Sequence, residues 1–283
     1  MAPPPEDTSV VVCSYAGDDA DLTLRCLGQV AAQTAPGNTL LIDMSRDERI
    51  VGPARSITGV TVDHVPQSTG LGWSRQHGLE RAATRYVAFL DSDALPRPGW
   101  LRALREAIAA DGVAISGGPV LPLWPEGVRI PRLFRTASAG DFLSMLDLGP
   151  EAMDVPRVLP GNMLVDLEAL GTTGFGQELG RREGDLFGAE EIAMMGALVD
   201  RGMRIVYTPG AAVDHTTTAE RQSWGWMWRR LEAAGRESVQ QHRRLAPLPR
   251  RPTVGDRLFQ AAVLLPFLLG RRRGRGAVPS ARP

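Results

Sequence analysis

The chain has 283 residues, of which 43% are hydrophobic and 6% aromatic, as in an ordinary soluble globular protein. Its 32 basic residues balance 32 acidic ones, and every basic residue is an arginine. The lack of lysine excludes chemistry that needs a Schiff-base lysine, a Walker P-loop lysine or a kinase-type phosphate-binding lysine.

The neutral net charge hides an uneven distribution. Residues 1–220 contain 18 arginines and 29 acidic residues, whereas residues 221–283 contain 14 arginines and 3 acidic residues. We therefore expect three parts: a disordered N-terminus (1–7), an α/β domain (8–220) and a basic helical C-terminal extension (221–283). Such an extension favours contact with an anionic surface, either lipid head groups or the acidic part of the same protein.

The N-terminus and the cysteines bear on the compartment. The first residues, MAPPPEDTS, lack the basic and then apolar pattern of a signal segment, so we do not expect secretion. Cys13 and Cys26 form neither a disulfide framework nor a metal-binding spacing. We therefore expect both thiols to be buried and reduced, in a reducing cytoplasm.

The first hundred residues alternate between apolar strands and helical segments. Strands are predicted at residues 9–15, 39–43, 60–65 and 86–93, and helices at 19–33, 73–84 and from Pro98 onward. This order predicts right-handed βαβ units and a mostly parallel sheet flanked by helices, which is an α/β fold.

The second half is less regular. In chain order we expect a strand at 113–124, a loop-rich segment at 125–157, a strand running into a helix at 158–170, a glycine-rich loop at 171–188, a helix at 189–202, a strand at 203–209 and an amphipathic helix from Ser223. On that last helix, Trp224, Met227 or Trp228, and Leu231 share one side.

Two aspartates end the fourth strand, in the stretch YVAFLDSDALPRPGW. Ligands of parallel sheets bind beyond the carboxyl ends of the strands, where Tyr15, Asp43, Asp91 and Asp93 all fall. Mg²⁺ or Mn²⁺ is usually held by one or two carboxylates together with a substrate diphosphate. The pair therefore indicates a metal–diphosphate site, with simple helix capping as the alternative.

The loop TGLGWSR has Gly70 and Gly72 but lacks the third glycine of a dinucleotide fingerprint. Arg75, at the start of the following helix, could hold a phosphate or pair with the aspartates. A plain surface salt bridge is the alternative.

Three further side chains are candidates for chemistry. Glu190 and Glu191 are adjacent at a helix start, so one of them at most faces a cleft, where it could act as a general base. Both could instead simply favour the helix N-terminus. His215 follows a strand and could be a metal ligand, a diphosphate contact or a structural histidine. His64 and His77 read as ordinary loop or helix positions.

The tail from Arg257 to Gly276 contains an apolar run of about ten residues broken by Pro266, and a membrane-spanning helix needs about 20. The segment could lie in a membrane interface, anchored by Arg271, Arg272, Arg273 and Arg275. Packing on the domain or on a partner subunit is the alternative.

Several motifs together resemble the nucleotide-sugar-dependent glycosyltransferases of the GT-A fold, family 2 in particular. They are SVVVCSY, LLID, TGLGWSRQHGLERAATRYVAFLDSDALPRPGWL, LPGNMLV, AEE and IVYTPGAAVDH, in the family's order over roughly residues 8–220. The resemblance implies a Rossmann-like sheet, a divalent ion (Mn²⁺ or Mg²⁺) and a nucleoside-diphosphate sugar donor. No nucleic-acid partner is expected.

The resemblance also implies roles for residues. Tyr15 and Asp43 would contact the base and ribose, Asp91 the ribose or the metal, and Asp93 the metal. Arg75 would order the aspartates and phosphates, Gly161 and Asn162 would line the sugar and acceptor pocket, and His215 would approach the metal or the diphosphate. Glu191, or its neighbour Glu190, would be the catalytic base.

The chain departs from the family pattern in three places. The first strand ends in CSYA rather than Pro-Thr-Tyr-Asn, the base motif is Glu-Glu rather than Glu-Asp, and Ala193 replaces the usual acidic residue two positions later.

We expect an inverting, metal-dependent glycosyltransferase located in the cytoplasm, with peripheral membrane contact through the tail. The alternatives are an inactive nucleotide-sugar-binding protein and a nucleotidyltransferase. The sequence does not specify the sugar, the nucleotide base, the oligomeric state or the acceptor, which could be a glycan, a lipid-linked sugar or a natural product.

Overall fold

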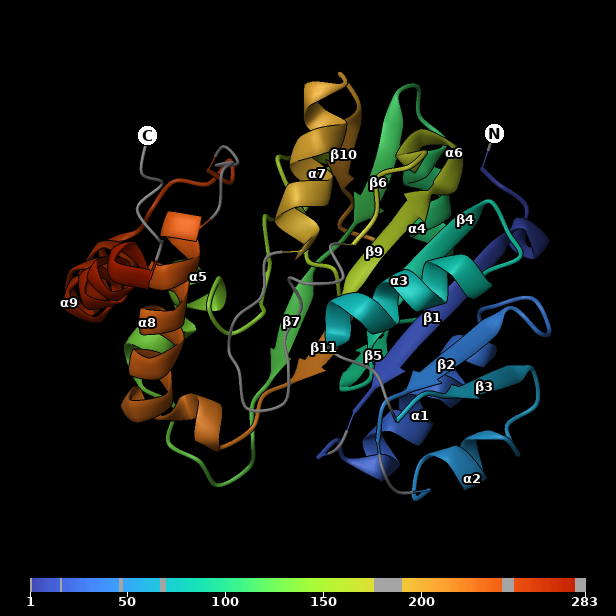
Figure 1. Cartoon of the computed structure of the whole chain (residues 1–283), viewed down its shortest axis with the longest axis horizontal. Coiled ribbons are helices and arrows are strands. Elements are labelled where there is room, and N and C mark those ends of the chain that lie inside the picture. Colours follow the sequence, from blue (N-terminus) through green and yellow to red (C-terminus); the bar gives the residue numbers. More distant parts are fainter. Residues whose placement is uncertain are drawn as a thin grey trace.

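A computed structural model of the chain describes residues 2–15, 17–45, 48–66, 70–175, 190–240 and 247–277. Within these residues an eight-stranded sheet has the order β3-β2-β1-β4-β9-β6-β10-β8 (Figure 1). Its strands are β1 (Thr8–Ser14), β2 (Thr39–Asp43), β3 (Val60–His64), β4 (Tyr86–Asp91), β6 (Val113–Gly117), β8 (Met153–Asp154), β9 (Asn162–Asp166) and β10 (Arg204–Tyr207).

Most of this sheet is parallel, which confirms the predicted fold class. Strands β3, β2, β1 and β4 run parallel to one another, and β6 runs parallel to β10. Strand β9 enters antiparallel between β4 and β6, and β8 is antiparallel at the edge. The central strands are apolar because both faces of the sheet are covered, and Val10, Val11 and Val12 are all fully buried.

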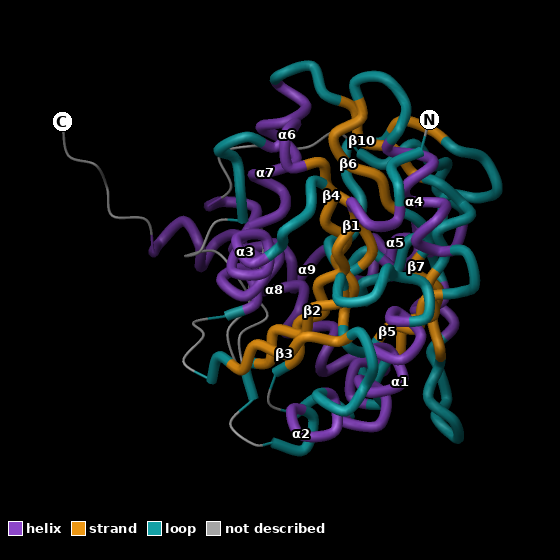
Figure 2. The backbone as a smooth tube through the Cα atoms, turned by 90° about the vertical axis from the view of Figure 1, so that its right-hand side faces the viewer, coloured by secondary structure: helices purple, strands orange, loops and turns teal. Residues whose placement is uncertain are grey.

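Helices cover both faces of the sheet, as Figure 2 shows from the side. One face packs against α1 (Ala20–Ala31), α2 (Val51–Ala54) and α4 (Trp100–Ile108). The other packs against α3 (Leu71–Arg81), α6 (Leu167–Leu170) and α7 (Glu190–Asp200). The result is a three-layer α/β domain with an apolar core on each side of the sheet.

A small second sheet lies at the carboxyl end of β4. It contains β5 (Ala94–Pro96), β11 (Val213–Thr216) and β7 (Val120–Leu123), with β11 antiparallel to β5 and parallel to β7. Two predicted strands are corrected here. The strand at 86–93 ends at Asp91, and the strand at 113–124 is divided between the two sheets. At the division Gly118 lies against the Ala211 backbone, with no room for a side chain.

The C-terminal helices and two short helices from the middle of the chain form a separate group beyond β7 and β11, at the left of Figure 1. This group contains η2 (Arg132–Arg135), α5 (Ala137–Gly140), η3 (Glu220–Gln222), α8 (Trp224–Gln240) and α9 (Val254–Ala277). It has its own core, which includes Phe134, Met227, Leu231 and Phe259.

Helices α8 and α9 meet closely where Gly235 lies against the α9 backbone at Phe267 and Gly270. The predicted apolar side of α8 needs a correction. Trp226, rather than Trp224 or Trp228, is the buried tryptophan of this helix, since the other two are more than 40% exposed.

Residues 1–7 were expected to be disordered, but Pro5–Asp7 form the short 3-10 helix η1. The Asn38 side chain donates to the Glu6 carbonyl at 2.9 Å, which holds this segment on the domain. At the other end of the chain, no described helix is long and apolar enough to cross a membrane.

Candidate metal and nucleotide site

The strand register aligns the polar ends of three neighbouring strands. Ser14 of β1 pairs with Asp43 of β2, and Cys13 of β1 pairs with Asp91 of β4. Since parallel strands end at the same edge, the sheet presents these polar side chains together at its carboxyl edge, where ligands bind in open α/β sheets.

Asp91, Asp93 and His215 come together at this edge. Each offers one ligand atom, and the three atoms lie within 4.8 Å of one another. The second sheet produces this meeting: His215 of β11 pairs with Ala94 of β5, and the Thr216 N–H donates to the Asp93 carbonyl at 2.9 Å. The imidazole Nε2 then lies 3.2 Å from Asp93 Oδ1.

The electrostatics of Asp93 and His215 favour an ion pair. Burial by itself would raise the pKa of Asp93, but the neighbouring His215 outweighs it and holds that pKa below its ordinary value. Burial would likewise lower the pKa of His215, but the Asp93 carboxylate outweighs it and raises that pKa. The buried Nδ1 of His215 has no hydrogen-bond partner among the described residues.

The donor set fits a divalent cation. Two carboxylate oxygens suit Mn²⁺ or Mg²⁺, and an imidazole nitrogen is an additional ligand that transition metals accept readily. The side chains of both aspartates are about one-third exposed, so diphosphate oxygens could reach the same ion.

Arg75 and Gly161 fix the position of Asp91. The Arg75 side chain, on α3, is buried and donates from Nη2 to Asp91 Oδ1 at 2.9 Å, so it is not a surface salt bridge. The Gly161 carbonyl accepts from the Asp91 N–H at 3.2 Å, and a side chain at Gly161 would collide with the Asp91 carboxylate.

Asp18 and Ser92 are site residues that the sequence analysis missed. Ser92, between the two aspartates, donates to Asp18 Oδ2 at 2.6 Å, and the same oxygen accepts from the Tyr15 N–H at 3.0 Å. Burial raises the pKa of Asp18 to about 6. Asp18 thereby ties the turn after β1 to the turn that carries the aspartates.

Asp43 is more enclosed than its expected role suggests. Its carboxylate is fully buried and accepts hydrogen bonds from Ser14 Oγ at 2.7 Å, Ser45 Oγ at 2.7 Å and His64 Nδ1 at 2.8 Å. His64, which the sequence analysis treats as an ordinary loop or helix position, is the exposed member of this hydrogen-bonded cluster. Its register opposite Asp43 at the end of β3 is the signal that could have identified it.

Tyr15 and Asn162 differ in their surroundings. The Tyr15 side chain is 43% exposed at the sheet edge, as a residue that contacts a base needs to be. Asn162 is fully buried: its Oδ1 accepts from Trp100 Nε1 at 2.7 Å, and its Nδ2 donates to the carbonyls of Pro119 and Ala211. This side chain joins three segments beneath the site instead of lining a pocket.

The two candidate bases lie at the start of α7. Glu191 is half-buried, whereas the side chain of Glu190 and most of the preceding glycine-rich loop lie outside the described residues. Within the described part of the chain, the cluster of metal-ligating side chains does not include Glu191.

Both cysteines are buried and unpaired, as the sequence predicted. Burial raises the pKa of the Cys13 thiol to about 12, and the pKa of Cys26 is raised further for the same reason. Neutral thiols of this kind are neither nucleophiles nor metal ligands at physiological pH.

Comparison with solved structures identifies the class of fold. The domain adopts the GT-A glycosyltransferase fold, as two solved structures show. One is GalNAc-T7 with UDP, GalNAc and Mn²⁺ (TM-score 0.59, 15% identity, covering 91% of this chain and 54% of that one). The other is the mannosyltransferase PcManGT from Pyrobaculum calidifontis with GDP-Man and Mn²⁺ (TM-score 0.56, 16% identity, covering 98% and 78%).

The sequence is similar to one family within this class. Residues 9–138 match the model of Glycosyl transferase family 2. The pre-mycofactocin glycosyltransferase of Mycobacterium tuberculosis is 27% identical over 58% of this chain, which spans only 34% of that relative. The succinoglycan biosynthesis protein ExoM of Rhizobium meliloti is 26% identical over 79% of this chain and 71% of its own length.

Proposed function

We propose that this chain transfers a sugar from a nucleoside-diphosphate sugar to an acceptor hydroxyl, in a metal-dependent reaction that inverts the anomeric carbon. The observation that carries the proposal is the cluster of Asp91, Asp93 and His215 at the carboxyl edge of the sheet, with Arg75 buried beside it. The family match and the Mn²⁺-containing structures with the same fold support it.

Asp91, Asp93 and His215 would hold the divalent ion, which supplies charge neutralisation for the leaving nucleoside diphosphate. Arg75 keeps Asp91 in place and adds positive charge to the same region. Tyr15 and the group formed by Asp43 and His64 lie at the ends of β1, β2 and β3, where they would contact the nucleoside.

Glu191, or Glu190, would take the proton from the acceptor hydroxyl as that oxygen attacks the anomeric carbon from the face opposite the leaving group. The attack forms the new glycosidic bond, and the bond to the nucleoside diphosphate breaks in the same displacement. No covalent enzyme intermediate is required, and the configuration is inverted.

We further propose that the chain acts in the cytoplasm and reaches the membrane surface through α9. The free thiols suit a reducing compartment. Leu258, Leu265 and Leu268 are exposed on α9, and Arg272 and Arg273 are exposed near its C-terminal end, a combination typical of a helix lying on anionic lipid.

Replacing Asp93 by Asn tests the function. Release of nucleoside diphosphate from UDP- and GDP-sugars would be measured with Mn²⁺, with Mg²⁺ and with EDTA, because an inactive binding protein releases none. We expect the wild type to be active only with metal, and Asp93→Asn to lose about 100-fold or more of that rate.

Asp214→Asn is the matched control, since Asp214 directly precedes His215 on β11 but its carboxylate pairs with Arg97, 2.7 Å away. It should keep its activity. Full metal-dependent turnover in Asp93→Asn would overturn the assignment.

A further inference from the structure

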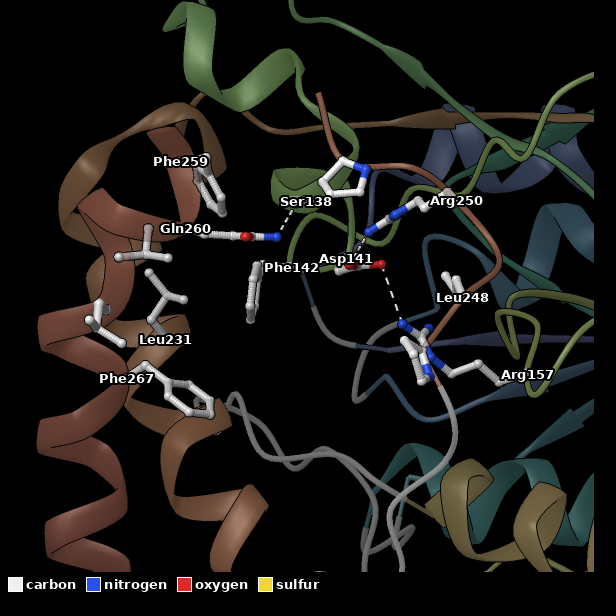
Figure 3. A pocket seen from close by; sticks show the side chains of 14 residues that line it. Ser138, Asp141, Phe142, Arg157, Leu231, Leu248, Arg250, Phe259, Gln260 and Phe267 are labelled. Carbon is white, nitrogen blue, oxygen red and sulfur yellow. Dashed lines mark hydrogen bonds and ion pairs between the residues drawn. The ribbon is translucent and has the colours of Figure 1, made fainter. Parts of the chain in front are cut away.

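A cavity of about 480 Å³ lies among α5, α8, α9 and residues 247–252 (Figure 3). Its volume is in the range of sites that bind small molecules. None of the residues that we assign to the metal or the nucleotide lines it. It is therefore a second concave site, separate from the one at the sheet edge.

One wall of this cavity is apolar. Figure 3 shows Phe142, Leu231, Phe259 and Phe267 gathered on the side formed by α8 and α9. Leu264 also lines the cavity and is 55% exposed, so the cavity opens beside the exposed apolar side chains of α9. This apolar wall suits the hydrocarbon chain of a bound ligand.

The opposite wall is charged. Asp141 Oδ1 lies 3.3 Å from Arg157 Nη2, and the other oxygen of Asp141 pairs with Arg250 (Figure 3). These three side chains, each only about a quarter exposed, are the charged ones among the described residues that line the cavity. Among the side chains that line the cavity, two guanidinium groups share one carboxylate, which gives the lining a net charge of +1 that suits a bound anion. The nearby Asp256 carboxylate does not line the cavity and accepts from the N–H groups of Ser138 and Thr253.

We propose that this cavity binds an amphipathic anion, with its phosphate or carboxylate at Arg157 and Arg250 and its hydrocarbon chain against α8 and α9. The proposal rests on the proposed function, because we assign this ligand to the anionic, apolar part of the sugar acceptor. A lipid-linked saccharide and a fatty acid derivative share this chemistry.

The chain path supports a role in acceptor binding. Arg157 precedes Gly161 by four residues, so their Cα atoms lie within about 15 Å of each other. Gly161 in turn lies against the carboxylate of Asp91. An acceptor whose head group sits at Arg157 could thus extend its hydroxyl-bearing part toward the donor.

Calorimetric titration of the full chain tests the proposal, with decyl phosphate, decanoate, decanol and inorganic phosphate as probes, each below its critical micelle concentration. We expect saturable one-to-one binding of decyl phosphate or decanoate, and the tighter of the two identifies the head group. If decanol or inorganic phosphate bound as tightly as decyl phosphate or decanoate, the proposal would be wrong, since neither of those two probes combines a charge with a hydrocarbon chain.

Variants locate the site. Arg250→Gln and Arg157→Gln should each weaken binding of the amphipathic probe by about tenfold or more, because a charge-assisted contact is lost. Arg257→Gln and Val254→Ser are controls on exposed positions of α9 outside the cavity, and they should bind like the wild type. Equal weakening in the controls would indicate unspecific adsorption and refute the cavity site.

A second measurement separates this proposal from the proposed function. Thermal stabilisation by UDP or GDP with Mn²⁺ should be unchanged in the Arg250 and Arg157 variants, which also shows that they fold. If the chain binds nucleotide but neither decyl phosphate nor decanoate, the cavity proposal is wrong and the proposed function is unaffected. Absence of nucleotide binding in the wild type would instead count against the proposed function.

Discussion

Gly161 illustrates how a single residue sets the geometry of the site. It precedes β9, and its Cα lies so close to the Asp91 carboxylate that any side chain would displace that group. Its backbone conformation is not one that requires glycine, since it is absent from the positive-φ residues. The requirement for glycine at this position is therefore steric and concerns the candidate metal site rather than the local fold.

Gly161→Ala should consequently lower Mn²⁺ affinity by about tenfold while the melting temperature changes little, since the methyl group moves a metal ligand and not the backbone. Mn²⁺ binding can be followed by electron paramagnetic resonance of the free ion. Gly28→Ala is the matched control, because nothing lies within 4 Å of a side chain added there. Unchanged Mn²⁺ affinity in Gly161→Ala would show that Asp91 is not a ligand.

The sequence predicts the positions of the candidate site residues better than their surroundings. The place of Asp91 and Asp93 at a strand end and of Arg75 near a helix start was predictable, because both are local signals. The pairing of His64 with Asp43 and the burial of Asn162 were not predictable, because their hydrogen-bond partners lie 21 and 62 residues away in the sequence.

At the scale of elements, Asp256 anchors the start of α9. Its carboxylate accepts from the Ser138 N–H at 2.7 Å, the Thr253 N–H at 2.9 Å and Thr253 Oγ1 at 2.7 Å. Burial would raise its pKa, but these hydrogen bonds outweigh that effect and lower the pKa to about 2. The bonds cap the helix and join it to α5.

Because the folded-state pKa of Asp256 is depressed, its contribution to stability is present above the unfolded pKa of about 4 and is lost as the pH falls toward 2. A shift of this size corresponds to about 2 kcal/mol. Asp256→Asn should therefore reduce the free energy of unfolding by about 1–3 kcal/mol at pH 7 and flatten its dependence on pH between 4 and 2.

Urea unfolding across this pH range measures both effects, and the exposed Asp111→Asn is the control. Equal stability of Asp256→Asn and wild type at pH 7 would contradict the anchoring role.

Helix α9 also exposes apolar side chains, with Leu265 at 60% exposure. We expect the chain to sediment with vesicles containing phosphatidylglycerol and much less with phosphatidylcholine alone, since arginines near the surface contribute about 1 kcal/mol each on anionic lipid. Leu265→Glu should reduce this binding severalfold, whereas Leu123→Glu, at an exposed site on β7, should not. If both variants sediment with the vesicles as fully as the wild type does, α9 is not the membrane contact.

At the scale of the whole molecule, the site joins distant parts of the chain, so a ligand bound there should stabilise the entire domain. A nucleoside diphosphate at 100 times its dissociation constant adds about 2.7 kcal/mol, which corresponds to several degrees in melting temperature. We expect this shift with UDP or GDP only when Mn²⁺ or Mg²⁺ is present, and its loss in Asp93→Asn. No shift with any nucleoside diphosphate and metal would exclude a donor site at the sheet edge.

The sequence was sufficient to predict the class of fold and the position of the aspartates, because hydrophobic periodicity and strand-end residues are local signals. It placed the strands of the parallel half to within two residues, as at Thr39–Asp43.

Four features are evident only in the tertiary structure. They are the reversed direction of β9, the division of residues 113–124 between two sheets, the pairing of His215 with Asp93 and the cavity beside α9. Each of these depends on pairing between segments far apart in the chain. The free energy of such contacts comes from burial and hydrogen bonding across the fold, and a local pattern of residues does not record it.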